Sequence, residues 1–165
     1  MQPKSGFYPI NTTIELSAHQ NKGWVFSAWS GNGSVSYTGS NPQANVVVQS
    51  PLSEEALFKP TVSICTSKGI SVVYNISIAT NNTIIPGKCI VILVNGKITL
   101  QAKPDFPFYT FLGWKGSINS TNSVITLFVT QPLFLQVKAG LNLLLMTIII
   151  LCILIAVFLA LKHRH

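Results

Sequence analysis

Side chains that could carry out catalysis are few in this chain and far apart in the sequence. Before the apolar C-terminal segment there is one histidine, His19, one aspartate, Asp105, and three glutamates, Glu15, Glu54 and Glu55. A Ser–His–Asp arrangement would have to bring His19 and Asp105 together from distant parts of the chain. Glu54 and Glu55 are adjacent, and adjacent side chains of a strand point to opposite faces, so they do not form a catalytic pair. We therefore predict no enzyme activity, no catalytic residue and no cofactor, with His19 in a turn.

The three cysteines lack the spacing to histidine or to one another that zinc ligands show, so no metal site is expected. Cys152 falls in the apolar segment and is expected to act as a small apolar residue. Cys65 and Cys89 lie near the two ends of a stretch, residues 61 to 93, whose pattern predicts two or three strands. We expect these two cysteines to form a disulfide, which an extracellular compartment permits. The alternative is a pair of buried free thiols.

Five asparagines stand in the N-x-[ST] pattern of N-glycosylation acceptors: Asn11, Asn32, Asn75, Asn81 and Asn119. Chance would give about two such sites for this content of Asn, Ser and Thr. The other explanation is that these residue types cluster in turns. We interpret the pattern as acceptor sites, which implies that residues 1 to about 140 lie outside the cell.

The C-terminal stretch LNLLLMTIIILCILIAVFLALKHRH has the composition of a membrane span. From Leu143 to Leu161 there is no charge and no proline, and this length spans roughly 28 Å as a helix, close to the ~30 Å hydrocarbon core of a bilayer. The alternative is a buried core helix, although such helices are rarely apolar on every face. We predict a transmembrane helix over residues 141–161, which makes the lipid bilayer a partner.

Charges beside this segment predict its orientation. Lys162, His163, Arg164 and His165 close the chain, whereas only Lys138 lies near the other end. The positive-inside rule then places a short tail, residues 162–165, in the cytoplasm and the rest of the chain outside, as a single-pass protein of the cell membrane.

The N-terminus, MQPKSGFYPI, lacks the apolar region of a secretory signal. We therefore expect the chain to be the C-terminal part of a longer one, a fragment. The alternative is a cytosolic binding module inserted by a tail anchor.

Basic residues are spread singly along the chain. Nine lysines and all four acidic residues precede the apolar segment, and this part of the chain contains no arginine. Nucleic-acid-binding proteins group lysine and arginine on one face, so we expect no nucleic acid as partner.

Two parts of the chain repeat one pattern in the same order. INTTIELSA (10–18) aligns with VNGKITLQA (94–102), FSAWSGNGS (26–34) with FLGWKGSIN (111–119), and QSPL (49–52) with TQPL (130–133). TIELSA and KITLQA alternate apolar and polar residues, which is typical of half-buried strands. No stretch before the apolar segment has helical periodicity. The duplication predicts two tandem β-rich modules, residues 1–59 and 60–139, in a mainly β protein.

Each module is expected to be centred on aromatic residues, Phe26 and Trp29 in one and Phe111 and Trp114 in the other. A thin core gains most from one large aromatic side chain. Strand alternation would place Trp29 on the face opposite Phe26 unless the strand bends, and Gly31 would permit a bend. The alternative is that Trp29 and Trp114 are exposed platforms that stack on sugars.

These residues resemble the divergent internalin-type B-repeat, also called the bacterial repeat domain. The first copy matches that pattern at Phe7, Tyr8, Pro9, Thr13, Leu16, Ala18, Gly23, Phe26, Trp29, Gly31 and Phe58. The second copy is more diverged and matches at Leu100, Ala102, Phe111, Gly113, Trp114 and Gly116. The resemblance implies small β modules, β-grasp-like in some relatives, that are strung along extracellular surface proteins. It does not imply one function, because such modules serve as spacers, adhesive units and enzyme appendages.

The leading hypothesis is a membrane-anchored extracellular repeat protein with a structural, stalk or adhesive role at the cell surface. Envelope proteins or surface glycans would be its partners. The alternative is the tethering region of a larger surface enzyme, such as a peptidase, with its catalytic part upstream. The first copy also lacks the strands that precede the shared pattern in the second, which leaves this module N-terminally incomplete, with an unpaired sheet edge.

Overall fold

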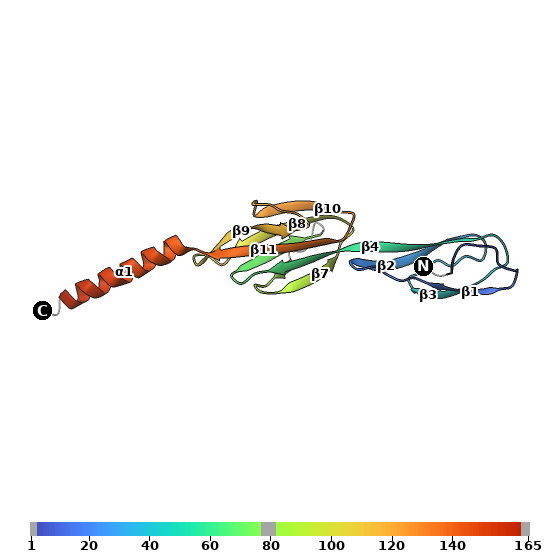
Figure 1. Ribbon diagram of the computed structural model, residues 1–165, viewed down its shortest axis with the longest axis horizontal. Helices are drawn as coiled ribbons and strands as arrows, with labels where there is room; N and C mark the ends of the chain where they lie inside the picture. Colours follow the sequence, from blue (N-terminus) through green and yellow to red (C-terminus); the bar gives the residue numbers. More distant parts are fainter. Residues whose placement is uncertain (1–2, 77–81, 163–165) are drawn as a thin grey trace. The chain divides into compact units, whose positions relative to one another are not determined.

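The computed structural model describes residues 3–76 and 82–162. Strands account for 53% of the chain and helix for 12%, which confirms a mainly β protein with one C-terminal apolar helix (Figure 1). The chain divides into two compact units, called unit 1 and unit 2 below. Unit 1 is formed mainly by Met1–Val62, and unit 2 mainly by Ser63–Val91, Lys97–Phe128 and the residues after Phe134.

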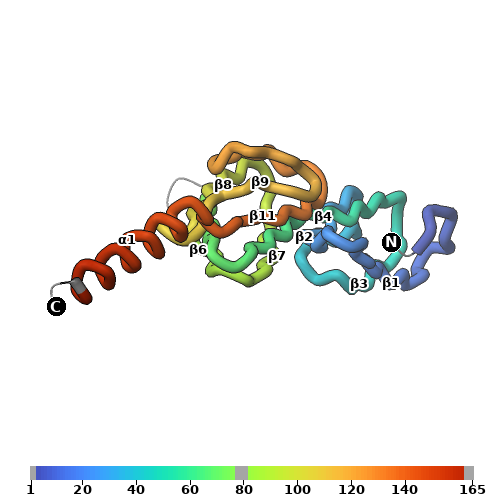
Figure 2. The backbone as a smooth tube through the Cα atoms, turned by 60° about the vertical axis from the view of Figure 1, so that its left-hand side comes forward, coloured from blue at the N-terminus to red at the C-terminus, as the bar shows by residue number. Residues whose placement is uncertain are grey.

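Unit 1 contains two antiparallel strand pairs. Its strands are β1 (Thr13–Ser17), β2 (Trp24–Asn32), β3 (Gln43–Val47) and the first part of β4 (Ser53–Thr66). β1 pairs with β3 in a two-stranded sheet, which Figure 2 shows side by side. β2 pairs with β4 from Trp24 opposite Pro60 to Asn32 opposite Ser53. The alternation expected for TIELS is present, because Leu16 is buried whereas Thr13 and Glu15 are exposed.

Unit 2 contains the remaining strands and is the larger of the two. They are β5 (Ile70–Asn75), β6 (Asn82–Ile84), β7 (Cys89–Leu93), β8 (Gly96–Pro104), β9 (Tyr109–Gly116), β10 (Val124–Val129) and β11 (Leu133–Leu141). One sheet has the order β10-β8-β5-β6, and in the other β9 follows β11, which follows β4. β7 also pairs with β4.

The strands repeat in the same order and pairing. β1 to β4 correspond to β8 to β11, because the pair β1–β3 recurs as β8–β10 and the pair β2–β4 recurs as β11–β9. Unit 2 adds β5, β6 and β7 to this four-strand pattern. β4 is continuous through residues 59 and 60, between which the duplication predicts a module boundary.

The two units differ in how much apolar surface they bury. Leu16, Trp29 and Val46 form a buried cluster of unit 1, with partly buried neighbours such as Ile14, Phe26 and Tyr37. Other buried apolar residues of this unit are Val62, Ile92, Val94 and Val129. Buried side chains of unit 2 include Ile64, Ile70, Val72, Ile84, Ile98, Leu100, Ala102, Trp114, Ile125, Leu135 and Val137. Buried apolar area is the main stabilising term of a fold, so unit 1 has the weaker core.

The C-terminal helix α1 (Leu143–Lys162) begins directly after β11. The side chain of Asn142 caps it, because its Oδ1 accepts a hydrogen bond from the backbone N–H of Leu145 at 3.3 Å. The helix thus begins two residues after the start of the predicted span, 141–161, because Leu141 is the last residue of β11. A leucine at this position fits an apolar run and a strand equally well.

Candidate functional site

The repeated aromatic motif forms a ring pair in unit 1. Phe26 and Trp29 lie on β2 with their ring centroids 5.9 Å apart and tilted by 56°. Trp29 is 1% exposed, and its backbone N–H donates a hydrogen bond to the carbonyl of Gly39 at 2.8 Å. Phe58, on the facing strand β4, adds an edge-on contact to Phe26 at 5.8 Å.

Unit 2 contains the same arrangement. Phe111 and Trp114 on β9 have ring centroids 6.2 Å apart, at an interplanar angle of 63°. Trp114 has no exposed surface, and its backbone N–H donates to the carbonyl of Ser120 at 2.8 Å. Because both indoles are enclosed, neither offers a face on which a sugar could stack.

A β-bulge at the same place in both motifs brings the rings together. In β2 the register against β4 shifts between Phe26 and Ala28, which leaves Ser27 as the extra residue. In β9 the register against β11 skips Leu112, the equivalent position. The extra residue reverses the alternation of faces, so that residues three apart point the same way.

The irregularity was expected at Gly31 and lies at Ser27 instead. In the second copy Gly113, with a positive φ, follows the extra residue, whereas Ala28 stands at this place in the first copy, so composition did not reveal the bulge in unit 1. The available signal was the repeated spacing of Phe and Trp, because two large aromatics three positions apart in a strand share a face only if the strand is bulged.

The glycines that follow the tryptophans have a separate role, close backbone packing. A Cβ atom on Gly31 would lie 2.5 Å from the carbonyl oxygen of Tyr37 and 2.8 Å from Oε2 of Glu54. A Cβ on Gly116 would collide with the carbonyl oxygen of Phe134, and the φ angle of +116° there also disfavours any other residue. The W-x-G spacing therefore reflects packing in both units.

The two indole N–H groups differ in their hydrogen bonding. Nε1 of Trp114 donates to the carbonyl of Asn122 at 2.9 Å. Nε1 of Trp29 is buried and has no partner among the residues that the structure describes. An unpaired buried donor is unfavourable by about 1–3 kcal/mol, so unit 1 carries a defect that unit 2 lacks.

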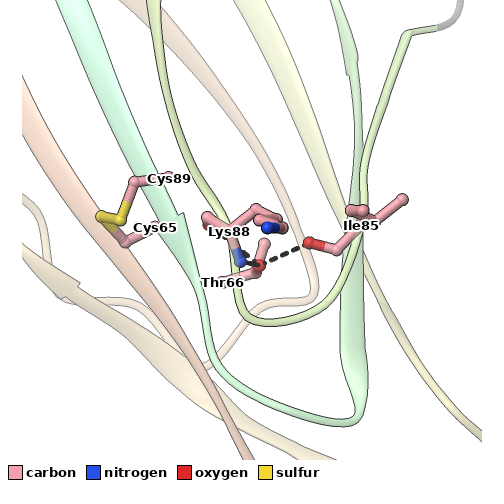
Figure 3. The surroundings of a disulfide bond; sticks show 5 residues. All are labelled: Cys65, Thr66, Ile85, Lys88 and Cys89. Atoms are coloured by element: carbon pink, nitrogen blue, oxygen red, sulfur yellow. Dashed lines mark hydrogen bonds between the residues drawn. A yellow bond between two sulfur atoms is a disulfide. The ribbon is translucent and has the colours of Figure 1, made fainter.

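Cys65 and Cys89 are joined by a disulfide between β4 and β7, with Cα atoms 4.0 Å apart (Figure 3). Thr66, the next residue, strengthens the same junction. Its buried hydroxyl lies 2.8 Å from the carbonyl oxygen of Ile85 and accepts a hydrogen bond from the backbone N–H of Lys88 at 3.1 Å. The backbone N–H of Thr66 donates to the Lys88 carbonyl at 2.8 Å. Covalent and polar contacts thus fix the start of β7 against the end of β4.

The predicted glycan acceptors lie at or near the surface where the structure describes them. Asn11, Asn32 and Asn119 are exposed, and Asn75, the last residue of β5, is half-buried. Asn81 lies outside the described residues. Glycan attachment at these asparagines stays a prediction.

The candidate catalytic residues His19 and Asp105 fall in different units. His19 belongs to unit 1 and Asp105 to unit 2. The Nε2 atom of His19 is 3.2 Å from the hydroxyl of Ser17, and this contact is exposed. Glu54 accepts a hydrogen bond through Oε1 from the backbone N–H of Tyr37 at 2.7 Å, which fixes the loop after β2. No group of three potential metal ligands occurs among residues 3–76 and 82–162.

Helix α1 is a candidate membrane-spanning helix. Leu143–Leu161 is long and apolar enough to cross a membrane, and none of its most apolar stretch is buried against the rest of the described structure. A core helix of a soluble protein would be largely buried.

Comparison with known proteins shows that one family model matches part of the chain. Residues 2–61 match the family model of the divergent InlB B-repeat domain, which confirms the resemblance for the first copy. This family suggests a non-catalytic structural domain. No curated protein and no solved structure matches the chain significantly. A B-repeat domain together with a C-terminal apolar helix is consistent with a membrane-anchored surface repeat protein.

Proposed function

We propose that this protein displays β modules at the cell surface from a single transmembrane helix and acts as a stalk or adhesive element without chemistry of its own. The observation that carries the proposal is the unburied apolar surface of α1, beside a segment that matches a B-repeat domain. Exposed leucines, isoleucines and Phe158 cover the helix all round. Lipid is the environment in which such a surface is stable.

The junction between β11 and α1 supports the same proposal. The backbone N–H of Asn142 donates a hydrogen bond to the carbonyl of Phe108 at 2.8 Å, which ties the loop before β9 to the helix start. Phe106 in this loop is 78% exposed, Phe108 is 48% exposed and Leu141 is 55% exposed. Exposed Phe and Leu side chains beside the end of a span are stabilised by burial at the boundary between headgroups and acyl chains.

The proposed orientation places both units outside the cell and residues 162–165 in the cytoplasm. It rests on the basic tail and on the exposed acceptor asparagines Asn32 and Asn119. Partners in the cell envelope, proteins or glycans, would meet module surfaces other than Trp29 and Trp114, because these two side chains are enclosed.

Cysteine labelling of the full chain in intact cells tests this proposal. Lys115→Cys, at an exposed position of unit 2, should react with a membrane-impermeant maleimide before the cells are opened. His165→Cys should react only after permeabilisation, and Cys152, within the span, should stay unlabelled in both cases. Labelling of His165→Cys alone in intact cells would show that the orientation is opposite to the proposed one. Labelling of both positions only after lysis would place the modules in the cytosol.

A further inference from the structure

Unit 1 has a strand edge that its counterpart in unit 2 covers. β8 pairs with β10 on one edge and with β5 on the other, from Ile70 opposite Pro104 to Asn75 opposite Thr99. β1 corresponds to β8 but pairs with β3 alone in a two-stranded sheet. Within the described residues, the edge of β1 that corresponds to the β5 side has no strand beside it. Such an edge presents unpaired backbone N–H and C=O groups.

A cavity of about 580 Å³ lies in unit 1 near this edge. Ile14, Leu16, Val46 and Leu52 contribute its apolar lining. Ile98 and Leu100, which correspond to Ile14 and Leu16, are completely buried in unit 2. Buried apolar residues of β5 and of the end of β4, such as Val72 and Ile64, fill the core there.

The segment before β1 shows the same deficit. Residues 5–9 correspond to β7, which pairs with β4 and is linked to its end by the disulfide. In unit 1 these residues form no strand. Ile10 is 72% exposed, whereas Val94, which corresponds to it, is completely buried. Both Phe7 and Ile10 line the cavity.

Unit 2 therefore shows which kind of segment would cover the open edge and the cavity of unit 1. In unit 2 the missing positions are filled by one continuous stretch, Ser63–Asn75, in which β4 ends, turns at Gly69 and returns as β5. This stretch directly follows the part of β4 that pairs with β2. A repeat thus ends in the strand pair that completes the next repeat.

We propose that unit 1 is a docking site for the outgoing strand pair of another repeat module of this kind, joined in tandem ahead of it. The pair would extend the β1–β3 sheet through backbone hydrogen bonds and insert apolar side chains into the cavity. This deepens the proposed function, because it makes each module the partner that completes its neighbour.

Glu54 specifies one property of the occupant. It lines the cavity, and its Oε2 is buried without a hydrogen-bond partner in the described structure. The equivalent position in unit 2 is Leu135, which is fully buried among apolar residues. A lysine or hydroxyl donor on the occupant would pair this oxygen and strengthen docking, whereas the pair in unit 2 makes only apolar contact at the equivalent place.

A full-length chain with its own strand pair duplicated tests the proposal. Ser5 corresponds to Cys89, so a second copy of residues 60–88, with its Cys65 changed to Ser, is placed directly before Ser5. The purified chain is studied in detergent by hydrogen exchange. The amides of β1 that point away from β3 are expected to exchange at least about tenfold more slowly than in the unmodified chain. The thiol-labelling rate of an Ile10→Cys variant should fall in parallel, because Ile10 corresponds to Val94, which is completely buried.

A matched control carries Val72→Pro in the added copy only, because proline cannot pair in the interior of a sheet. Unchanged exchange in β8 shows in both chains that unit 2 remains folded. Equal exchange of the β1 amides in all chains, or equal slowing by the proline control, would overturn the proposal. Slowing that depends on protein concentration in the unmodified chain would identify a second copy as the occupant instead. Since detergent replaces the membrane, these results are independent of the proposed orientation.

Discussion

Phe26 and Trp29 stand three positions apart on β2, and their rings nevertheless lie on one side of the strand with centroids 5.9 Å apart. Phe111 and Trp114 repeat this relationship on β9 at 6.2 Å. Both depend on one extra residue in the strand, so the bulge belongs to the repeat as much as the aromatic residues do. The motif is a packing device that gives a small module its largest buried side chain.

Replacing Trp29 and Trp114 by phenylalanine should destabilise the two units to different extents. Trp114→Phe loses the hydrogen bond from Nε1 to the Asn122 carbonyl, whereas Trp29→Phe loses none within the described structure. We expect Trp114→Phe to lower the free energy of unfolding of its unit by about 1 kcal/mol more than Trp29→Phe does in its own. Hydrogen-exchange mass spectrometry of the β2 and β9 peptides measures both. A larger loss from Trp29→Phe would contradict the assignment of the indole partner.

The glycine after each tryptophan should not tolerate alanine. Gly31→Ala places a Cβ against the Tyr37 carbonyl, and Gly116→Ala adds strain from its positive φ. Each change should lower the free energy of unfolding by about 1–3 kcal/mol. Gly6→Ala is the control, because the nearest atom to its Cβ would be 4.0 Å away and no positive φ is involved. Urea titration compares the three variants, and a neutral Gly31→Ala would refute the close-packing role.

Reduction should destabilise unit 2 selectively. Cys65 and Cys89 are 24 residues apart, and a cross-link of this loop size stabilises a fold by about 3 kcal/mol in the chain-entropy view. Alkylation of the denatured, unreduced chain should modify Cys152 alone, and all three cysteines after reduction. Three modified thiols without reductant would show that the bond is absent from the protein as produced.

The loop before β9 should touch the membrane interface. A tryptophan introduced as Phe106→Trp should be quenched by lipids brominated near the headgroups when the full chain is reconstituted in vesicles. Phe128→Trp on β10 is the matched control, because Phe128 is 76% exposed but is not tied to the helix start. We expect strong quenching at position 106 and little at 128, after subtraction of the native tryptophans. Equal quenching at positions 106 and 128 would contradict a specific contact between the loop before β9 and the membrane interface.

The sequence predicts the elements better than it predicts their connections. Alternation in TIELS and KITLQ predicts β1 and β8, and the charge-free run predicts α1, because each pattern reflects a local environment. The bulge at Ser27 has no local signature, since it is the register against β4 that creates it. The 14-residue length of β4 was not predicted either, because the strand pairs with β2, β11 and β7 within one sheet and its pattern of buried faces changes along its length.

The candidate site was predicted in part for the same reason. Duplication pointed to Trp29 and Trp114 as core residues, and both are enclosed. The roles of Thr66 and Glu54 were not predicted, because each depends on a loop brought near by the fold. The unequal lengths of the copies predicted that β1, unlike β8, pairs with one strand only within the described residues, whereas the cavity beside β1 required the structure.

The most direct test of membrane anchoring is extraction of membranes with alkaline carbonate. The account predicts that the unmodified full chain stays in the membrane pellet. A chain with Ile150→Lys and Leu154→Lys should move to the supernatant, since each charge near the middle of a span is unfavourable by about 2.5–3.5 kcal/mol. Release of the unmodified chain by carbonate would contradict the account, because an anchored helix is not removed by high pH.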